Sequence, residues 1–267
     1  MGADIKSLRT RIKSVKSTLQ LTNAMGLVAS SKIRRATEAM QKSGAYAAAV
    51  SDAVSLLVAS PECRKSPYMR QSEGARTRLL VIAGDRGLAG GYNANVFRLA
   101  KEYPEAQLIP IGKKAGDRFG EETLSSEKCS GADAAALARH LCEEFAAGEY
   151  DRLGILYTQY HSMLSQQAAV KWVLPLTRDE NAPTRSVLFE PDAAQILQAA
   201  VPEYLTGQIV AAIRESFCSE VAARRMAMDS AGKNAQQMLD DLQLSYNQAR
   251  QGTITQEITE IVAGAGS

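Results

Sequence analysis

Apolar residues near the start of the chain recur at alternating intervals of three and four. Ile5, Leu8, Ile12, Val15 and Leu19 form this series. It is the heptad pattern of a helix that packs against one partner helix. No proline interrupts residues 4 to 58, so the pattern predicts a single long helix there.

Farther along this helix the apolar seam shifts, passing through Met25, Val28, Ile33, Ala36 and Met40. A shift of this kind changes the local supercoil without ending the helix. Some 55 residues at about 1.5 Å each would make a rod of roughly 80 Å. Such a rod is too long to be buried inside a compact domain of this size.

The same spacing returns near the end of the chain. Its members are Leu239, Leu242, Tyr246, Ala249 and Thr253, and a stripe of Ile254, Ile258 and Ile261 follows. Two proline-free helices of similar length at opposite ends favour a long antiparallel two-helix coiled coil built from the N- and C-terminal segments. We expect Pro202 to divide a short helix from the long one, which then covers about 203–262.

The middle of the chain has a different period, and Pro61, Pro67 and Gly74 predict a linker before it. Apolar runs predict strands at 77–83, 108–111, 153–159, 168–176 and 186–189, and helical patterns cover 93–102 and 132–147. This alternation indicates an α/β domain with a largely parallel sheet. The predicted division is 1–60 for the first coiled-coil helix, 61–192 for the inserted α/β domain and 193–267 for the second helix.

Composition adds little to this picture. The 267 residues are 45% hydrophobic and 22% charged, with a net charge of +2, as in ordinary soluble proteins. The four cysteines form no CxxC pair, which predicts reduced thiols in a cytosol-like compartment. No apolar run approaches the roughly 20 residues that span a bilayer, and no secretory signal is evident.

Positive charge is concentrated near the N-terminus, where up to residue 42 nine lysines and arginines face only Asp4 and Glu38. These cations flank the apolar seam, so a solvated coiled-coil face is the favoured interpretation. An acidic protein partner is the main alternative, and a membrane surface is a less favoured one. Nucleic acid is disfavoured because no aromatic residues for base stacking are interleaved with the cations.

A glycine-rich segment, GDRGLAGGYN at 84–93, lies between a predicted strand and a predicted helix. Loops in this position can cradle phosphates. However, the segment matches neither GxGxxG nor GxxxxGK[ST], and Asp85 would repel a phosphate. We therefore expect a tight crossover from strand to helix, with Asn93 capping the helix.

Candidate catalytic side chains are sparse. His140 and His161 have no evident carboxylate or cysteine companion, and Glu143 and Glu144 are typical of a solvated helix face. Trp172 is expected in the core, and no metal-ligand spacing occurs. We predict no catalytic, cofactor-binding or metal-binding residue.

The last stretch, NQARQGTITQEITEIVAGA at 247–265, resembles the C-terminal signature of the γ subunit of F-type ATP synthases. Agreement extends in order along essentially the whole chain. The further matching segments are Ile5–Lys6, Arg11–Ile12, Thr22–Met25, Val28–Lys32, Asp85–Leu88, Gly90–Asn93, Glu190–Asp192, Ala222–Arg224 and Met226–Met228. The chain departs from that family at Gly84, where Ser or Thr is usual, and at Ala89, where Cys is usual.

The resemblance implies a two-helix coiled coil with an inserted Rossmann-like α/β domain, acting as a non-catalytic central rotor shaft. Its partners would be three α and three β subunits, the ε subunit and the c-ring, with no nucleic acid and no cofactor. Rotation of the c-ring by ion flow would turn the shaft and drive ATP synthesis or hydrolysis on the β subunits. The location would be peripheral, at the cytoplasmic face of a bacterial membrane, which the chain would reach only through partners.

The resemblance also implies roles for individual residues. Those expected to contact β subunits are Met25, Lys32, Arg224, Arg250, Gln251 and Thr255. Ile258, Ile261 and Val262 would form an apolar tip that turns in a bearing, and Glu190 would lie near the c-ring. Two alternatives stay open: a nucleotide-binding α/β enzyme with helical arms, and a coiled-coil scaffold unrelated to energy conversion.

Overall fold

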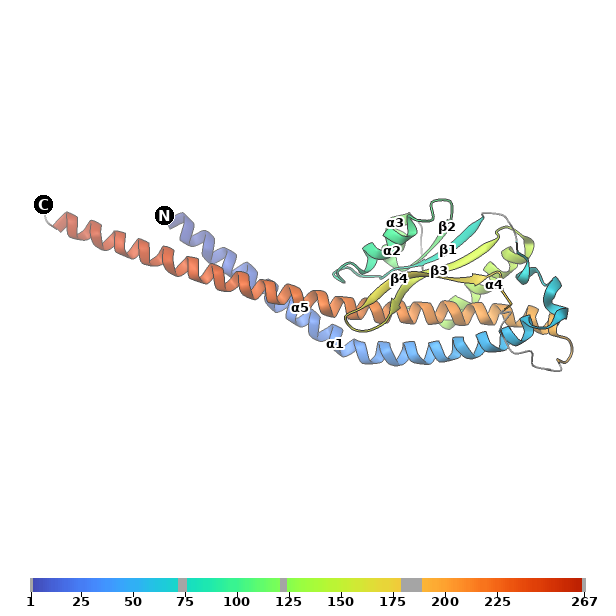
Figure 1. Cartoon of the computed structure of the whole chain (residues 1–267). Helices are drawn as coiled ribbons and strands as arrows, with labels where there is room; N and C mark the ends of the chain where they lie inside the picture. Colours follow the sequence, from blue (N-terminus) through green and yellow to red (C-terminus); the bar gives the residue numbers. More distant parts are fainter. Residues whose placement is uncertain (1, 72–75, 121–123, 179–188, 266–267) are drawn as a thin grey trace. The chain divides into compact units, whose positions relative to one another are not determined.

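The computed structural model describes residues 2–71, 76–120, 124–178 and 189–265 (Figure 1). Contacts divide the chain into two compact units. The helical unit comprises Met1–Ser30 and Arg224–Ser267, and the sheet unit comprises Ser31–Ala223. Helix α1 (Gly2–Val58) and helix α5 (Ala193–Ala265) each contribute to both units.

In the helical unit, α1 and α5 pack against each other as the heptad pattern predicts. Ile5, Leu8, Ile12, Val15 and Leu19 are all half-buried, whereas most residues between them are exposed. On α5, the matching residues Leu239 and Leu242 are buried. The apolar seams therefore face the partner helix, and the predicted pairing of the two ends of the chain is confirmed.

The helices of this unit approach closely at two glycines. A β-carbon at Gly26 would lie 3.0 Å from Arg225 Nη1, and one at Gly232 would lie 3.2 Å from Asn23 Oδ1. Gly26 of α1 lies beside Arg225 of α5, whereas the earlier residue Asn23 lies beside the later residue Gly232, so the two helices are antiparallel.

The seam departs from the prediction at Val28, which is 57% exposed, while Thr22 and Ala29 are buried. Small side chains occupy the seam here, and this permits the close approach of the backbones.

In the sheet unit, four strands lie in the order β2-β1-β3-β4. Their bounds are Thr77–Ile82 for β1, Gln107–Ile111 for β2, Arg152–Tyr160 for β3 and Gln166–Leu174 for β4. Strand β1 is parallel to β2 and β3, but β4 is antiparallel to β3. The sheet is therefore mixed, because the turn at 161–165 is too short to carry a crossover.

Alternate residues of the strands point to opposite faces of the sheet, and each face has its own core. Leu79, Val81 and Leu156 pack with helix α2 (Tyr92–Ala100) on one face. Leu80 and Ile155 pack on the other with helix α4 (Gly131–Ala147) and with the first part of α5. Within this unit the sheet thus lies between two helical layers (Figure 1).

Local signals set the ends of α4 as expected. Ser130 and Asp133 form a capping box at its start, and Gly148 adopts the left-handed conformation at its end. Helix α3 (Lys113–Phe119) was not predicted. It follows Gly112, whose φ of 98° suits glycine.

Pro202 does not divide two helices, contrary to the sequence expectation, because α5 is continuous from Ala193 to Ala265. A proline removes one backbone donor. Here the neighbouring Leu197, Val201 and Leu205 are fully buried in the core, and their packing holds the helix through the proline.

The predicted linker is also part of the fold. Pro61–Lys65 and Pro67–Met69 form two short 3-10 helices, and Cys63 and Tyr68 are buried in the main core. Gly74 lies outside the described residues, as does most of the predicted strand 186–189.

Helix α5 contains an 18-residue window with a mean hydropathy of 1.2, so length and composition alone would let it cross a membrane. Half of that window is buried within the protein. Packing against the sheet accounts for its apolar character, as in the core helix of a globular unit.

Candidate functional site

The glycine-rich segment 84–93 forms the expected crossover from β1 to α2. A hydrogen bond between the two ends of the segment stabilises its conformation, since the Gly84 N–H donates to Asn93 Oδ1 at 2.9 Å. Asn93 therefore fastens the loop, and the predicted helix cap is wrong: Gly91 occupies the cap position without a side-chain bond. Leu88 has a positive φ of 62° and is 63% exposed at this loop.

Asp85 faces protein donors at the position where a phosphate loop would hold its ligand. Its carboxylate accepts bonds from the backbone N–H groups of Lys113 at 2.8 Å, Ser126 at 3.1 Å and Glu127 at 3.0 Å, and from Ser125 Oγ at 2.5 Å. Burial raises the pKa of Asp85, but these four bonds outweigh it and bring the pKa below its ordinary value. The loop is thus built around an internal carboxylate.

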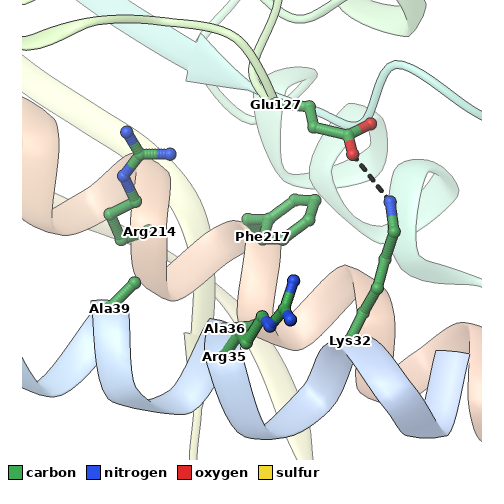
Figure 2. A pocket seen from close by; sticks show the side chains of 7 residues that line it. All are labelled: Lys32, Arg35, Ala36, Ala39, Glu127, Arg214 and Phe217. Carbon is green, nitrogen blue, oxygen red and sulfur yellow. Dashed lines mark hydrogen bonds and ion pairs between the residues drawn. The ribbon is translucent and has the colours of Figure 1, made fainter.

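Glu127 extends this network to helix α1. Its carboxylate accepts a bond from Lys32 Nζ at 2.7 Å (Figure 2). It also lies 3.5 Å from Arg86 Nη2. The bond from Lys32 is the main cause of a lowered pKa for Glu127. The side chains of Lys32 and Glu127 are 40% and 31% exposed, so the pair lies at the surface of the sheet unit.

A pocket of about 260 Å³ lies beside this ion pair, between α1 and α5. Phe217, Ala36 and Ala39 form its apolar part, and Figure 2 shows Arg35 and Arg214 near Phe217. Lys32, Arg35 and Arg214 carry three positive charges, and Glu127 carries the one negative charge. The pocket is therefore positive overall and favours acidic groups over basic ones.

Helix α5 presents buried polar side chains to strand β3. Ser216 Oγ accepts a bond from the Thr158 N–H at 3.3 Å, and Ser219 Oγ donates to the Thr158 carbonyl at 3.1 Å. Glu215 Oε1 accepts from the Tyr160 N–H at 3.0 Å. The register with β1 ends at Leu156, so these side chains satisfy the part of β3 that extends beyond β1.

Two more contacts tie the crossover loop to α5. The Tyr92 hydroxyl lies 2.7 Å from Ser216 Oγ, and both groups are buried. A β-carbon at Gly84 would lie 2.7 Å from the Cδ atom of Glu220, whose side chain is itself buried. Glycine at position 84 therefore leaves room for this carboxylate.

The structure brings no catalytic group together from the sparse candidates. His140 is exposed, lying 3.6 Å from Glu144, and His161 is exposed in the turn after β3. Glu143 is solvated as expected, but Glu144 is only 17% exposed and pairs with Arg78.

Trp172 is 37% exposed and therefore is not the core residue that was expected. Its ring lies 4.1 Å from the guanidinium carbon of Arg152, so the indole stacks beneath a cation at the surface. The antiparallel β4 lies at the edge of the sheet, which explains this exposure.

Cysteine and metal chemistry find no support among the described residues. All four cysteines are unpaired and buried. Burial raises the pKa of Cys142 to about 12, so this thiol stays protonated. Across the described ranges, no group of three or more His, Cys, Asp or Glu side chains could hold a metal ion.

The residues predicted to contact partners have side chains available at the surface. Arg250, Gln251 and Thr255 are exposed on α5, and Met25 and Arg224 are half-buried in the helical unit. Lys32 differs because the structure gives it a partner within the chain, Glu127. Glu190 is exposed just before α5.

The predicted apolar tip is exposed as well. Ile258 is 56% exposed, Ile261 is 70% exposed and Val262 is 67% exposed. Exposed aliphatic side chains clustered on one helix are typical of a surface that another protein covers.

Sequence reasoning missed the polar contacts between the helices and the sheet. A signal existed for α5, since Ser216, Ser219 and Glu220 fall at helical spacing within an otherwise apolar face. No comparable signal predicts the bond between Lys32 and Glu127, which are 95 residues apart.

Comparison with known proteins identifies the family. A family model described as ATP synthase matches residues 4–267. The ATP synthase gamma chain of Ruminococcus albus is 37% identical over 277 residues, covering 97% of this chain and 96% of that protein. The sodium ion specific gamma chain of Acetobacterium woodii is 34% identical over 298 residues and covers 99% of each chain.

Solved structures share the fold. A chain of the Euglena gracilis mitochondrial ATP synthase, from an OSCP/F1/c-ring structure in rotational state 3, matches 98% of this chain and 94% of its own length, with a TM-score of 0.68 and 20% identity. A chain from the central stalk and c-ring of the Tetrahymena thermophila enzyme gives a TM-score of 0.63 at 22% identity, over 79% of this chain and 99% of its own. Full-length sequence identity and this shared fold lead to one conclusion: the chain belongs to the ATP synthase gamma chain family.

Proposed function

We propose that this chain is the non-catalytic central rotor shaft of an F-type ATP synthase. The observation that carries the proposal is identity of 34% to gamma chains over 99% of the chain, including both long helices. In this role the paired helices transmit torque from the c-ring to the ring of three α and three β subunits, where the nucleotide chemistry occurs. Asp85 supports the non-catalytic assignment, because protein donors already satisfy its carboxylate in the glycine-rich loop.

The proposed contacts with β subunits use exposed polar groups near the end of α5 and side chains of both helices. Arg250 and Gln251 carry several donors each and are exposed. Thr255 is exposed, although its hydroxyl already donates to the Gln251 carbonyl at 3.0 Å. Lys32 and Arg224, together with Met25, complete the proposed β-facing set.

The apolar tip is proposed to turn inside a collar of the α and β subunits. Ile258, Ile261 and Val262 offer no directional bonds, so contacts at the tip can change as the shaft turns. At the other end, Glu190 and the inserted domain are proposed to meet the polar loops of the c-ring and the ε subunit.

The proposed domain division assigns 1–60 and 193–267 to the shaft and 61–192 to the inserted domain. In a bacterial cell, the shaft would lie at the cytoplasmic face of the membrane and associate with it only through its partners.

Assembly tests the proposal. The chain is mixed with cognate α and β subunits, and the product is examined for stoichiometry and ATP hydrolysis. We expect a stable complex that contains one copy of this chain and hydrolyses ATP, whereas the chain alone does not bind ATP. Tight stoichiometric ATP binding by the isolated chain, or failure to assemble, would contradict the proposal.

A narrower test addresses the end of α5. The double variant Arg250→Ala with Gln251→Ala should lower the coupled turnover of the assembled enzyme while leaving the chain folded, because both side chains are exposed. Arg139→Ala is the matched control, since Arg139 is an exposed arginine on α4. Unchanged turnover in the double variant would refute the contact role of these two residues.

A further inference from the structure

We propose that Glu127 is a positioning residue that fastens the inserted sheet to the part of helix α1 around Lys32, within the same unit, so that the sheet does not slip along this helix. This inference rests on the proposed rotor function. It concerns a bond within the chain, made by Lys32, which is also one of the residues proposed to face a β subunit. The Glu127 strut is defined here as the path from Asp85 through Glu127 to Lys32.

The base of the strut is rigid. Asp85 follows β1 closely and accepts bonds from the backbone N–H groups of Ser126 and Glu127 and from the Ser125 hydroxyl. It also accepts a bond from the Lys113 N–H at the start of α3. Four donors on one carboxylate fix the backbone that carries Glu127 relative to the sheet.

The tip of the strut reaches α1. Glu127 Oε1 accepts from Lys32 Nζ at 2.7 Å (Figure 2). Arg86 Nη2 lies 3.5 Å from Glu127 Oε2. Arg86 adjoins Asp85 in the crossover loop, so both ends of the carboxylate have a cationic neighbour. Charge-assisted bonds of this kind are short and directional.

Helix α5 holds the same sheet through a separate set of bonds. Ser216 and Ser219 bond both backbone groups of Thr158, and Glu215 accepts from the Tyr160 N–H. A sheet that is bonded to α5 alone can still rotate about the axis of α5. A second directional attachment, to α1, removes this freedom.

Apolar packing alone does not supply that restraint at this place. Val54, Leu57 and Val58 of α1 join the main core, but they lie several turns after Lys32 along the helix. Apolar contacts resist separation without specifying direction, whereas a hydrogen bond weakens steeply when its atoms slide. The Lys32–Glu127 bond is therefore suited to resist sideways slip under load.

The test uses the complete ATP synthase, with this chain in place, reconstituted in sealed lipid vesicles. Two quantities are measured: the rate of ATP hydrolysis without an ion gradient, and the ions taken up per ATP hydrolysed, with H⁺ and Na⁺ followed in parallel. The variants are Glu127→Ala and Glu127→Asp. The control is Glu38→Ala, because Glu38 pairs at 3.9 Å with Arg34 inside α1 and, in the part of the chain that the structure describes, connects no second element.

Loss of a partly exposed ion pair changes an equilibrium constant by about twofold to fivefold. Here that constant relates the sheet bonded to α1 and the sheet displaced along α1. We expect Glu127→Ala to keep its hydrolysis rate while ions moved per ATP fall, by no more than this factor. Glu127→Asp should recover part of this loss because it retains a carboxylate, and Glu38→Ala should match the unaltered enzyme. The melting temperature of the purified chain should fall by at most about 4 °C in any of the three variants.

An unchanged ratio of ions to ATP in Glu127→Ala would overturn the inference, as would an equal fall in Glu38→Ala. Loss of hydrolysis together with coupling in Glu127→Ala would mean defective assembly and would also overturn it. The proposed rotor function fails by a different result, in which the unaltered chain does not assemble or its complex moves no ions.

Discussion

Ser216 and Thr158 bind each other across the boundary between helix α5 and strand β3, the serine Oγ accepting from the Thr158 N–H at 3.3 Å. The same hydroxyl lies 2.7 Å from that of Tyr92. The buried Ser216 side chain thus makes a hydrogen bond to the β3 backbone that a neighbouring strand would otherwise make. Through this contact, the long helix that forms the shaft also completes the sheet.

Removing the Ser216 hydroxyl should therefore destabilise the chain. Ser216→Ala leaves the Thr158 N–H and the Tyr92 hydroxyl without this partner, at an expected cost of about 2–4 kcal/mol in the free energy of unfolding. Denaturant unfolding of the purified chain measures this. Ser245→Ala is the control, because Ser245 is exposed and its hydroxyl donates to the Asp241 carbonyl of its own helix. An equal loss in both variants would contradict the assigned role.

Asp85 should be the most sensitive position of the glycine-rich loop. Asp85→Ala removes the acceptor of four donors, and we expect a loss of about 2–4 kcal/mol in the free energy of unfolding. Asp117→Ala provides the comparison, because Asp117 forms an exposed pair with Lys114 and should change stability by less than about 0.5 kcal/mol. If Asp85→Ala were as mild, the loop would not depend on this carboxylate.

Two glycines should respond in opposite directions to alanine. A β-carbon at Gly112 would lie 2.0 Å from the Ala83 carbonyl oxygen, and its φ is 98°. Gly112→Ala should therefore destabilise by about 3 kcal/mol or more.

Gly44 lies inside α1, where among the described residues a β-carbon would meet no atom beyond the adjacent helix backbone within 4 Å. Gly44→Ala should stabilise by about 0.5–1 kcal/mol. Thermal melts of both variants test this contrast, and a fall in melting temperature for Gly44→Ala would contradict the open environment described for it.

The contribution of Glu127 should depend on pH with a defined sign. Lys32 lowers the pKa of this carboxyl below the ordinary value of 4.5. The unfolded chain then takes up the proton first as pH falls, so the pair stabilises the fold above pH 4.5 and loses its effect below it. At pH 7 we expect Glu127→Gln to be less stable by up to about 1 kcal/mol, since the pair is partly exposed.

The difference between Glu127→Gln and the unaltered chain should shrink as pH falls from 4.5 through the lowered pKa. Urea unfolding at several pH values measures it. A difference that grows on acidification would reverse the sign and exclude the proposed pairing.

Local patterns predicted most elements because their causes are local. The spacing of Ile5, Leu8 and Ile12 needs only one partner helix, and Gly148 ends α4 through its own backbone conformation. The continuity of α5 through Pro202 was not predictable in this way. It depends on tertiary burial of Leu197 and Leu205, which overrides the local cost of proline.

The candidate site was predicted less completely than the fold. The sequence indicated that Asp85 disfavours a phosphate, but the donors that satisfy it come from residues 113 and 125–127. Lys32 was assigned to partner contacts, whereas its bond to Glu127 joins residues that are distant in the chain. Such pairings arise from the fold and leave no periodic signal in the sequence.

Rotation within the assembled complex tests the rotor account most directly. The four native cysteines are buried, so a cysteine introduced by Leu164→Cys, at a side chain that is 78% exposed, offers a selective site for an optical probe. The α and β subunits are fixed to a surface and ATP is added. The account predicts that the probe turns in one direction, pausing once for each of the three β subunits, and ATP hydrolysis with a probe that stays fixed relative to the ring would contradict it.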